Sequence, residues 1–287
     1  MRWLVAVAAL VGCGRLGFDP EPAPPRAPWD GPFTLTAPEP VTGINSSTFE
    51  TECFVTADGL TLYFASDRAD SLGFHDIYSA SRPARDAAFG AVVHHAELST
   101  PDFEGRFVLA GDRGYLWSDR PGGLGKTDLW EVAPPFDNAH VSDLAAVSTT
   151  DFDYDPWPSA DGQRLYYGLH SDIGVAERDA GGAFGAGVVI AELSSASVED
   201  NPAVSADELF LMFSSDRPGG MGQKDIYFAR RADRDAAFSA PALLPIVNTA
   251  DNDYEACLTE DGELYFSSDR AGGMGSDDIY RAQFVPL

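Results

Sequence analysis

The sequence predicts an all-β fold, a five-bladed β-propeller with four-stranded antiparallel blades. Three observations lead to this prediction. A stretch that reads SSDRAGGMGSDDIYRA from Ser267 recurs in varied form from Ser214, Trp117 and Ala65, and such repeats define an architecture. Asp-Gly turns separate short apolar runs, which is a strong hairpin signal. No segment carries a helical apolar period over three turns, so a helical repeat is excluded.

Each repeat unit contains four strand-like segments. The first strand follows an acidic loop and leads into a turn, which is Asp58-Gly59 in the first unit. The second strands are expected at residues 62–64, 115–117, 165–167, 211–213 and 264–266. The third strands begin at Asp76, Asp128, Asp172, Asp225 and Asp278. The fourth strands are expected over residues 89–98, 136–144, 184–193 and 238–247.

The two ends of the repeat region complement each other. The fifth unit stops soon after its third strand, whereas a single fourth-type strand, residues 33–41, precedes the first unit. We expect this N-terminal strand to complete the last blade and close the ring, because closure removes exposed strand edges. The propeller is therefore assigned to residues 32–287.

In four of the five units an Asp-Arg pair precedes the third-strand Asp at a fixed spacing. The members of this repeat motif are Asp67, Arg68 and Asp76; Asp119, Arg120 and Asp128; Asp216, Arg217 and Asp225; and Asp269, Arg270 and Asp278. The third unit keeps Asp172 but reads Gly168-Leu169-His170 where the others read Ser-Asp-Arg or its equivalent, which predicts one short loop. The Gly-Gly-x-Gly loops lack the helix and the Lys-Ser/Thr of a phosphate-binding loop, so we interpret them as turns.

These motifs resemble a known propeller family. Asp-Gly-x-x-Leu-Tyr-Phe-Ser-Ser-Asp-Arg, followed by Gly-Gly-x-Gly and Asp-Ile-Tyr, is similar to the WD-repeat-like propeller repeats of the TolB type, over residues 33–287. The resemblance implies the propeller fold. It does not specify a function, because such repeats occur in partner-binding periplasmic proteins, in peptidase accessory domains and in many lipoproteins.

The N-terminus has the features of an export signal. Met1-Arg2 is followed by an apolar stretch, residues 3–11, that is too short to span a membrane. Leu10 to Cys13 resembles the bacterial lipobox, which implies removal of residues 1–12 and lipidation of Cys13; the alternative is a plain secretory signal. Residues 13–31 then form a Pro-rich tether. We expect an exported lipoprotein of the bacterial cell envelope, and Gly14 after the Cys favours the outer membrane.

The net charge of −26 makes nucleic acid and an anionic membrane surface unlikely partners, so membrane contact is expected only through the lipid anchor. A single closed ring suggests a monomer. Two further cysteines, Cys53 and Cys257, fall in the first and last units, which are neighbours in a closed ring. They form either a disulfide, which an exported protein can acquire, or two buried free thiols.

Acidic residues recur just before the first strand of each unit. The eighth residue before the turn Asp is acidic throughout: Glu50, Glu104, Asp153, Glu199 and Asp253. Two residues after these stand Glu52, Arg106, Asp155, Asn201 and Glu255. Because alternate residues of a strand share a face and the first strands line a propeller channel, we expect two stacked acidic rings at one mouth of the channel.

Like charges placed in this way repel, so something must offset them. A cation is one answer: Ca²⁺ suits carboxylate oxygens, and Glu50, Asp153 and Asp253 are the tentative ligands. The motif arginines are a second answer, since they could pair with the acids and brace the blades. Protonation of some carboxyl groups, with raised pKa values, is the third. No other cofactor is assigned.

No assembled catalytic motif occurs, neither Gly-x-Ser-x-Gly nor His-Glu-x-x-His. We therefore predict no catalytic residues and interpret the chain as a non-catalytic binding or scaffold module. Its acidic channel mouth would bind a protein, a peptide or a cell-envelope ligand. The alternative is a glycan-acting hydrolase that uses carboxylates at the same mouth.

Overall fold

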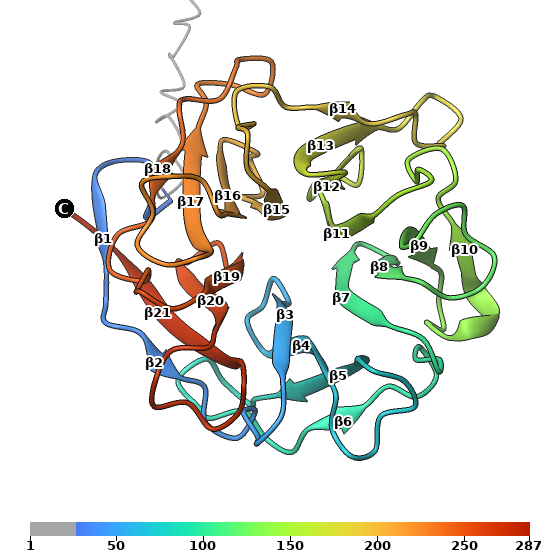
Figure 1. Ribbon diagram of the computed structural model, residues 1–287, viewed down its shortest axis with the longest axis horizontal. Coiled ribbons are helices and arrows are strands. Elements are labelled where there is room, and N and C mark those ends of the chain that lie inside the picture. Colours follow the sequence, from blue (N-terminus) through green and yellow to red (C-terminus); the bar gives the residue numbers. More distant parts are fainter. Residues whose placement is uncertain (1–26) are drawn as a thin grey trace, which may run out of the picture.

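The computed structural model describes residues 27–287 and confirms the predicted five-bladed propeller (Figure 1). Blade 1 contains β3 (Glu50–Val55), β4 (Thr61–Ser66), β5 (Asp76–Ser81) and β6 (Val93–His94). Blade 2 contains β7 (Glu104–Ala110), β8 (Arg113–Ser118), β9 (Asp128–Val132) and β10 (Val141–Asp143). Blade 3 contains β11 (Asp153–Pro158), β12 (Arg164–Leu169), β13 (Asp172–Glu177) and β14 (Val188–Val189). Blade 4 contains β15 (Glu199–Val204), β16 (Phe210–Ser215), β17 (Asp225–Arg230) and β18 (Ala242–Leu243).

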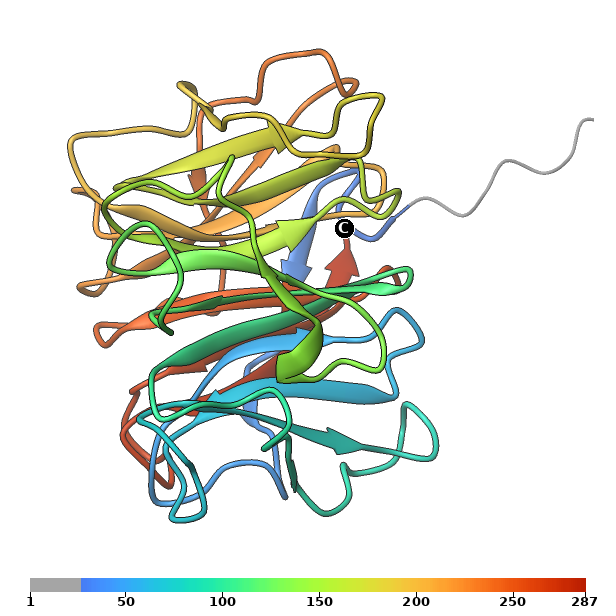
Figure 2. The ribbon, with the colours of Figure 1, turned by 90° about the vertical axis from the view of Figure 1, so that its right-hand side faces the viewer.

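Blade 5 joins the two ends of the described chain. It contains β19 (Asp253–Leu258), β20 (Glu263–Ser268) and β21 (Asp278–Pro286), together with β1 (Phe33–Leu35) and β2 (Glu39–Pro40). Both N-terminal strands pair antiparallel with β21, Leu35 opposite Phe284 and Pro40 opposite Tyr280. They therefore act as one interrupted fourth strand, and Figure 2 shows β1 beside the C-terminal strand.

In every blade the first strand, whose first residue is acidic, lies innermost, so that β3, β7, β11, β15 and β19 surround the central axis (Figure 1). The described residues contain no α-helix, only the short 3-10 helix η1 (Asn138–His140). Within residues 27–287, no helix has the length and the apolar character needed to cross a bilayer. The predicted signal peptide, Cys13 and most of the tether lie outside the described residues.

The outer strands are much shorter than the sequence predicted, two or three residues each. The phenylalanines expected to begin them lie in the preceding loops. Phe89, Phe184 and Phe238 are buried there, each beneath an arginine whose Cζ atom lies 4.0 to 4.8 Å from the ring centre. The apolar residues of these segments are thus buried against the blade, although most of the segment does not pair as a strand.

Aromatic side chains of the middle strands form the core between blades. Phe64, Phe213 and Phe266 are fully buried, and each stacks on the tyrosine of the neighbouring third strand at a centroid distance of 5.9 Å. Trp29, which the sequence analysis placed in the tether, is also buried, and it stacks on Phe210 at 5.4 Å. Residues that the sequence analysis assigned to the tether therefore pack against the propeller.

Candidate functional site

Five residues, one from each innermost strand, form what we call the bulge ring. Their φ angles are all positive: 57° at Glu52, 39° at Arg106, 57° at Asp155, 54° at Asn201 and 55° at Glu255. Non-glycine residues seldom adopt this conformation, and when they do it is often at functional sites. Each innermost strand shifts register with its neighbour at this point. The ring residues therefore occupy β-bulges, which re-aim side chains.

The bulge ring gathers three carboxyl groups and one guanidinium into a buried cluster. Arg106 is fully buried, and Glu52, Asp155 and Glu255 are 6%, 3% and 7% exposed. Arg106 Nε lies 3.7 Å from Asp155 Oδ1, and the backbone N–H of Glu52 donates to Glu255 Oε2 at 2.7 Å. One cation thus faces three acids at the centre of the propeller.

Burial raises the pKa values of all three acids, and repulsion between acids adds to the shift at Glu255 and Glu52. Burial raises the pKa of Glu255 to about 7, with a further contribution from the charge of Asp155. Burial and the charges of Asp155 and Glu255 raise the pKa of Glu52 well above its ordinary value. Burial also raises the pKa of Asp155, but Arg106, Lys224 and the Asn201 amide oppose that shift. Asp155 is thus the acid of the cluster with the most support for its charged form.

The cluster opens into a cavity of about 380 Å³, which we call the cleft. Glu52, Asp155 and Glu255 line its floor, and the aromatic side chains that line it are Phe103, Trp117, Phe152 and Tyr154. The indole N–H of Trp117 donates to Glu52 Oε2 at 2.7 Å, so the ring is fixed beside a cluster carboxyl group. Asp200 also lines the cleft and pairs with Lys224; burial raises its pKa to about 6. A polar floor with aromatic walls is typical of sites for small polar ligands.

The other predicted acids, which we call the outer acids, do not line the cleft. They are Glu50, Glu104, Asp153, Glu199 and Asp253, and all five are fully buried. Each accepts hydrogen bonds from the segment leading into its own strand, as Glu104 does from Thr100 N and Oγ1 at 2.8 and 2.5 Å. The bulge interrupts the strand alternation, so residues two apart no longer share a face.

The arginines of the repeat motif supply counter-charges to the outer acids. Four pairs form: Arg68 with Glu50 at 3.1 Å, Arg120 with Glu104 at 3.2 Å, Arg217 with Glu199 at 3.0 Å, and Arg270 with Asp253. Each pair lies within a single blade. The arginine also donates to a carbonyl oxygen in the segment that leads into its blade, such as Leu98 O at 2.9 Å for Arg120.

The aspartates of the motif hold backbone N–H groups. Asp67, Asp119, Asp216 and Asp269 accept from the residue just before each outer acid, at 2.7 to 3.0 Å. Asp76, Asp128, Asp225 and Asp278 accept from the Gly-rich loop, at 2.6 to 3.0 Å to Leu72, Leu124, Met221 and Met274. Asp172 has no such loop, because only His170 and Ser171 separate β12 from β13. The motif therefore builds loops rather than a binding site.

Asp153 differs from the other outer acids because blade 3 lacks the Ser-Asp-Arg motif. Its Oδ2 accepts from Thr149 N at 2.5 Å, but no residue within 27–287 donates to its buried Oδ1. Burial raises the pKa of Asp153. Blade 3 thus contains the outer acid Asp153 but lacks the loop whose arginine pairs with the outer acid in the other four blades.

The tentative metal ligands are not brought together. Glu50, Asp153 and Asp253 each bind groups of their own blade. Among residues 27–287 there is no group of three or more His, Cys, Asp or Glu side chains arranged to hold a metal ion. In the described structure the arginine pairs offset the charge of four outer acids, and burial raises the pKa values of the acids in the bulge ring.

Cys53 and Cys257 lie side by side beneath the bulge ring. Both are buried free thiols, with their Sγ atoms 2.8 Å apart, and Cys53 Sγ also contacts Glu255 O at 3.4 Å. Strands β3 and β19 therefore bring the first and last blades into contact, as ring closure requires.

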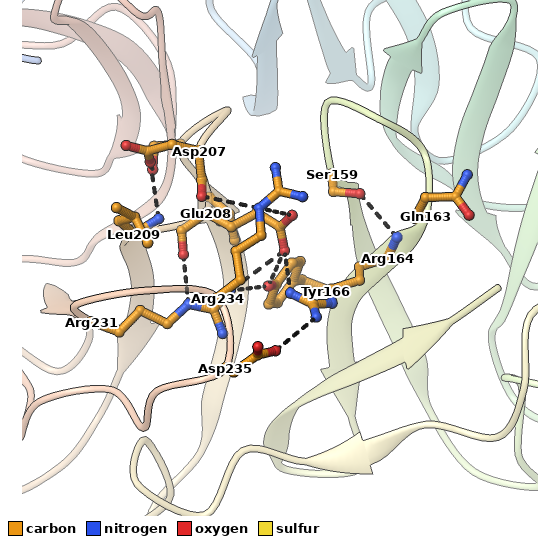
Figure 3. Close-up of polar contacts among 12 residues, drawn as sticks. Ser159, Gln163, Arg164, Tyr166, Asp207, Glu208, Leu209, Arg231, Arg234 and Asp235 are labelled. Carbon is orange, nitrogen blue, oxygen red and sulfur yellow. Dashed lines mark hydrogen bonds and ion pairs between the residues drawn. The ribbon is translucent and has the colours of Figure 1, made fainter.

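The sequence analysis did not predict the polar network that surrounds Glu208. Glu208 has a φ of 62° and replaces the glycine of the Asp-Gly turns, and its side chain is 1% exposed. Its carboxylate accepts from Tyr166 Oη at 2.6 Å and pairs with Arg164, Arg231 and Arg234 at 3.2 to 3.4 Å (Figure 3). These residues come from blades 3 and 4, so the network joins the two blades. The sequence signal for this network was Glu208 itself, which stands at a turn position that is glycine in other repeat units.

No protein-family model and no curated protein matches the chain. Several solved structures share the fold. A family-43 glycoside hydrolase from Bacillus licheniformis has a TM-score of 0.56 at 12% identity, covering 86% of this chain and 56% of that one. An arabinanase from Bacillus subtilis has a TM-score of 0.51 at 12% identity, covering 84% and 95%. TolB from Acinetobacter baumannii has a TM-score of 0.41 at 17% identity, covering 72% and 47%.

These comparisons contradict the interpretation of the chain as a non-catalytic binding or scaffold module that is not an enzyme. Glycoside hydrolases, one of them an arabinanase, are among the similar structures, and each covers more than four fifths of this chain. The non-catalytic interpretation relied on the acidic residue that recurs in every blade, because such a repeat indicates architecture rather than a catalytic pair. The outer acids are structural, whereas the bulge ring singles out three carboxyl groups. At these identities the likeness shows the fold alone.

Proposed function

We propose that the protein is a hydrolase of glycosidic bonds that acts in the cleft with carboxyl groups of the bulge ring. The observation that carries the proposal is the cluster of Glu52, Asp155 and Glu255 around Arg106, at the floor of an aromatic cleft. Glycoside hydrolysis needs one carboxylic acid that keeps its proton near neutral pH and a second carboxylate that is charged.

The electrostatic differences within the cluster suggest the roles. Glu255, with a pKa of about 7, is the general acid that protonates the departing glycosidic oxygen. Asp155, supported by Arg106 and Asn201, is the general base that takes a proton from water as the oxygen of that water attacks the anomeric carbon. The bond between that carbon and the glycosidic oxygen breaks, and each fragment leaves with a hydroxyl group. Glu52 positions Trp117, because the indole N–H donates to Glu52 Oε2 at 2.7 Å.

The cleft walls suit a sugar. Faces of sugar rings are apolar and pack on aromatic side chains, while their hydroxyl groups bond to carboxylates and amides. Trp117 and Tyr154 offer such faces beside Asp155. Similar folds include arabinanases, so neutral pentose glycans are the first substrates to test.

The test is hydrolysis of nitrophenyl glycosides and soluble neutral polysaccharides by the purified protein and by single variants. Asp155→Asn and Glu255→Gln are each expected to lower kcat/KM by at least about 100-fold, a typical contribution of general acid or base catalysis. Asp112→Asn removes an exposed carboxylate from the turn between β7 and β8 and should leave the activity unchanged. Equal activity in all three variants, or no hydrolysis of any glycoside by the parent protein, would refute the proposal.

We also propose that the protein is exported and anchored to the bacterial outer membrane through Cys13, without direct contact with nucleic acid and as a monomer. The lipobox-like segment and the Pro-rich stretch support this proposal. Metabolic labelling with a fatty acid should mark the full chain and should be lost in Cys13→Ala.

A further inference from the structure

The cleft lies where the rim of the propeller is interrupted. In blades 1, 2, 4 and 5 a loop of nine residues joins the second and third strands, between paired residues such as Ser118 and Asp128. In blade 3 the paired residues are Leu169 and Asp172, and only His170 and Ser171 lie between them. One loop is therefore missing from a ring of five.

The four long loops close the rim between successive blades. The last glycine of each loop lies against the backbone of the segment that leads into the next blade. A Cβ atom at Gly73, Gly125, Gly222 or Gly275 would collide with the carbonyl oxygen of Asp102, Asp151, Asp251 or Thr48, respectively. Blade 3 has no such loop to pack on the segment before β15. The short turn still meets the start of β15, where the Glu199 N–H donates to Ser171 O at 2.9 Å. Among residues 27–287, the long loop that covers the rim in the other blades is missing only between blades 3 and 4.

The cleft lies next to this gap in the rim. Its wall includes Lys126 and Thr127 at the end of the loop of blade 2, Phe152 and Tyr154 of blade 3, and Lys224 at the end of the loop of blade 4. The two long loops flank the short turn on either side. The residues that line the cleft thus run from the central cluster to the entry of blade 3, between the long loops of blades 2 and 4.

Two glycines leave room for aromatic side chains that line the cleft. Gly105 on β7 faces Trp117 on β8, and a Cβ at Gly105 would collide with the indole. Blade 3 reverses the arrangement: Tyr154 on β11 faces Gly168 on β12, whose Cβ would lie 2.7 Å from the tyrosine ring. The Tyr154 hydroxyl donates to His170 O at 3.2 Å, so the short turn itself holds the ring in place. Neighbouring blades thus present two aromatic rings along the path.

We infer that the substrate is a polymer, a neutral glycan chain that runs over Tyr154 and leaves the molecule above the short turn of blade 3. This inference rests on the proposed function and extends it. A closed rim would admit only a chain end, whereas the open rim lets the chain continue past the cluster, so bonds inside the chain are cleaved. The two cleft lysines are paired with Asp151 and Asp200, so the cleft offers no free cation for an acidic glycan.

The decisive variant restores the missing loop. Replacing His170-Ser171 with residues 119–127 of blade 2 leaves Gly168 and Tyr154 in place and closes the rim. We expect kcat/KM for a neutral polysaccharide, with linear arabinan as the first probe, to fall at least about tenfold. The value for the matching nitrophenyl glycoside should stay within about threefold. The parent protein should release oligosaccharides from arabinan, and polygalacturonate should be neither cleaved nor bound.

A second variant covers the case in which the grafted chain fails to fold, which its melting temperature would reveal. Phe152 is 43% exposed on the path over blade 3, and Phe152→Ala should raise KM for the polymer several-fold more than KM for the nitrophenyl glycoside. Equal effects on both substrates in a folded graft, or release of monosaccharide alone by the parent protein, would overturn the inference and leave the proposed function standing. Absence of all hydrolysis would instead refute the proposed function.

Discussion

The guanidinium of Arg217 pairs at 3.0 Å with the fully buried carboxylate of Glu199 from the same blade. Arg217→Ala would leave that carboxylate without its counter-charge, and removing one partner of a buried pair costs about 3 kcal/mol. Urea unfolding should show this loss. Arg113→Ala is the matched control, because the Arg113 side chain is 46% exposed and its pairs with Asp112 and Glu131, at 3.8 and 3.6 Å, are long, so its loss should cost under about 1 kcal/mol. Equal losses in both variants would contradict the structural role of the motif.

Stability should fall as the pH rises from about 4.5 to about 8. The pKa of Glu255 is raised from 4.5 to about 7 and that of Asp200 from 3.8 to about 6, so the folded state binds more protons than the unfolded chain in this range. Unfolding then becomes easier as those protons are lost. Carboxyl groups with lowered pKa values, such as Asp161 at about 2, titrate below this window.

The pH effect can be assigned with one variant. Glu255→Gln removes a shift worth on the order of 3 kcal/mol between the two ends of the range. The free energy of unfolding, measured in urea at pH 5 and pH 8, should therefore depend less on pH in this variant than in the parent protein. The same dependence in both proteins would show that Glu255 is not the group responsible.

Gly222→Ala should destabilise the propeller, because the new Cβ would collide with the backbone oxygen of Asp251 in the next blade. Backbone cannot move aside as a flexible side chain can, and overpacking of this kind costs about 1–3 kcal/mol. Gly185→Ala is the control, since the nearest atom to its Cβ would be 3.7 Å away. Thermal unfolding of the two variants compares them directly, and a tolerated Gly222→Ala would argue against tight packing of the rim.

Cys53 and Cys257 should form a disulfide when the protein matures in an oxidising compartment, because their Sγ atoms are already 2.8 Å apart. The bond would link blades 1 and 5 and should stabilise the ring by between about 2 and 5 kcal/mol. Alkylation of the denatured, unreduced protein followed by mass spectrometry counts the free thiols. Modification of both cysteines would rule the bond out, and Cys53→Ser provides the reference mass for a single free thiol.

The repeats made the fold predictable, whereas the candidate site was predictable only in part. Asp-Gly turns and recurring Ser-Asp-Arg segments locate blades because hairpins and loops are local in sequence. The bulges at Glu52, Asp155 and Glu255 are not visible in an alternating pattern, so the sequence placed these residues on the same face as the outer acids. Their separation depends on a backbone shift that only strand pairing reveals.

Some signals of the cleft were present but went unused. Gly105 and Gly168 stand where other blades carry side chains, and each makes room for an aromatic ring on the neighbouring strand. The missing loop of blade 3 was recognised, but its meaning required the position of the cleft. Contacts between blades, such as those of Glu208, join residues far apart in the sequence and cannot be predicted from local pattern.

The pairing of β1 and β2 with β21 also constrains the order of folding. During synthesis the first four blades can assemble as soon as their own strands emerge, since each is continuous in the sequence. Blade 5 cannot assemble in this way, because its outer strands β1 and β2 are synthesised first and its strands β19, β20 and β21 are synthesised last. Until then the N-terminal strands have no partner, and a chain stalled before β21 would expose them to other molecules. The edge formed by β1 and β2 is thus the part of the propeller that becomes protected last during folding.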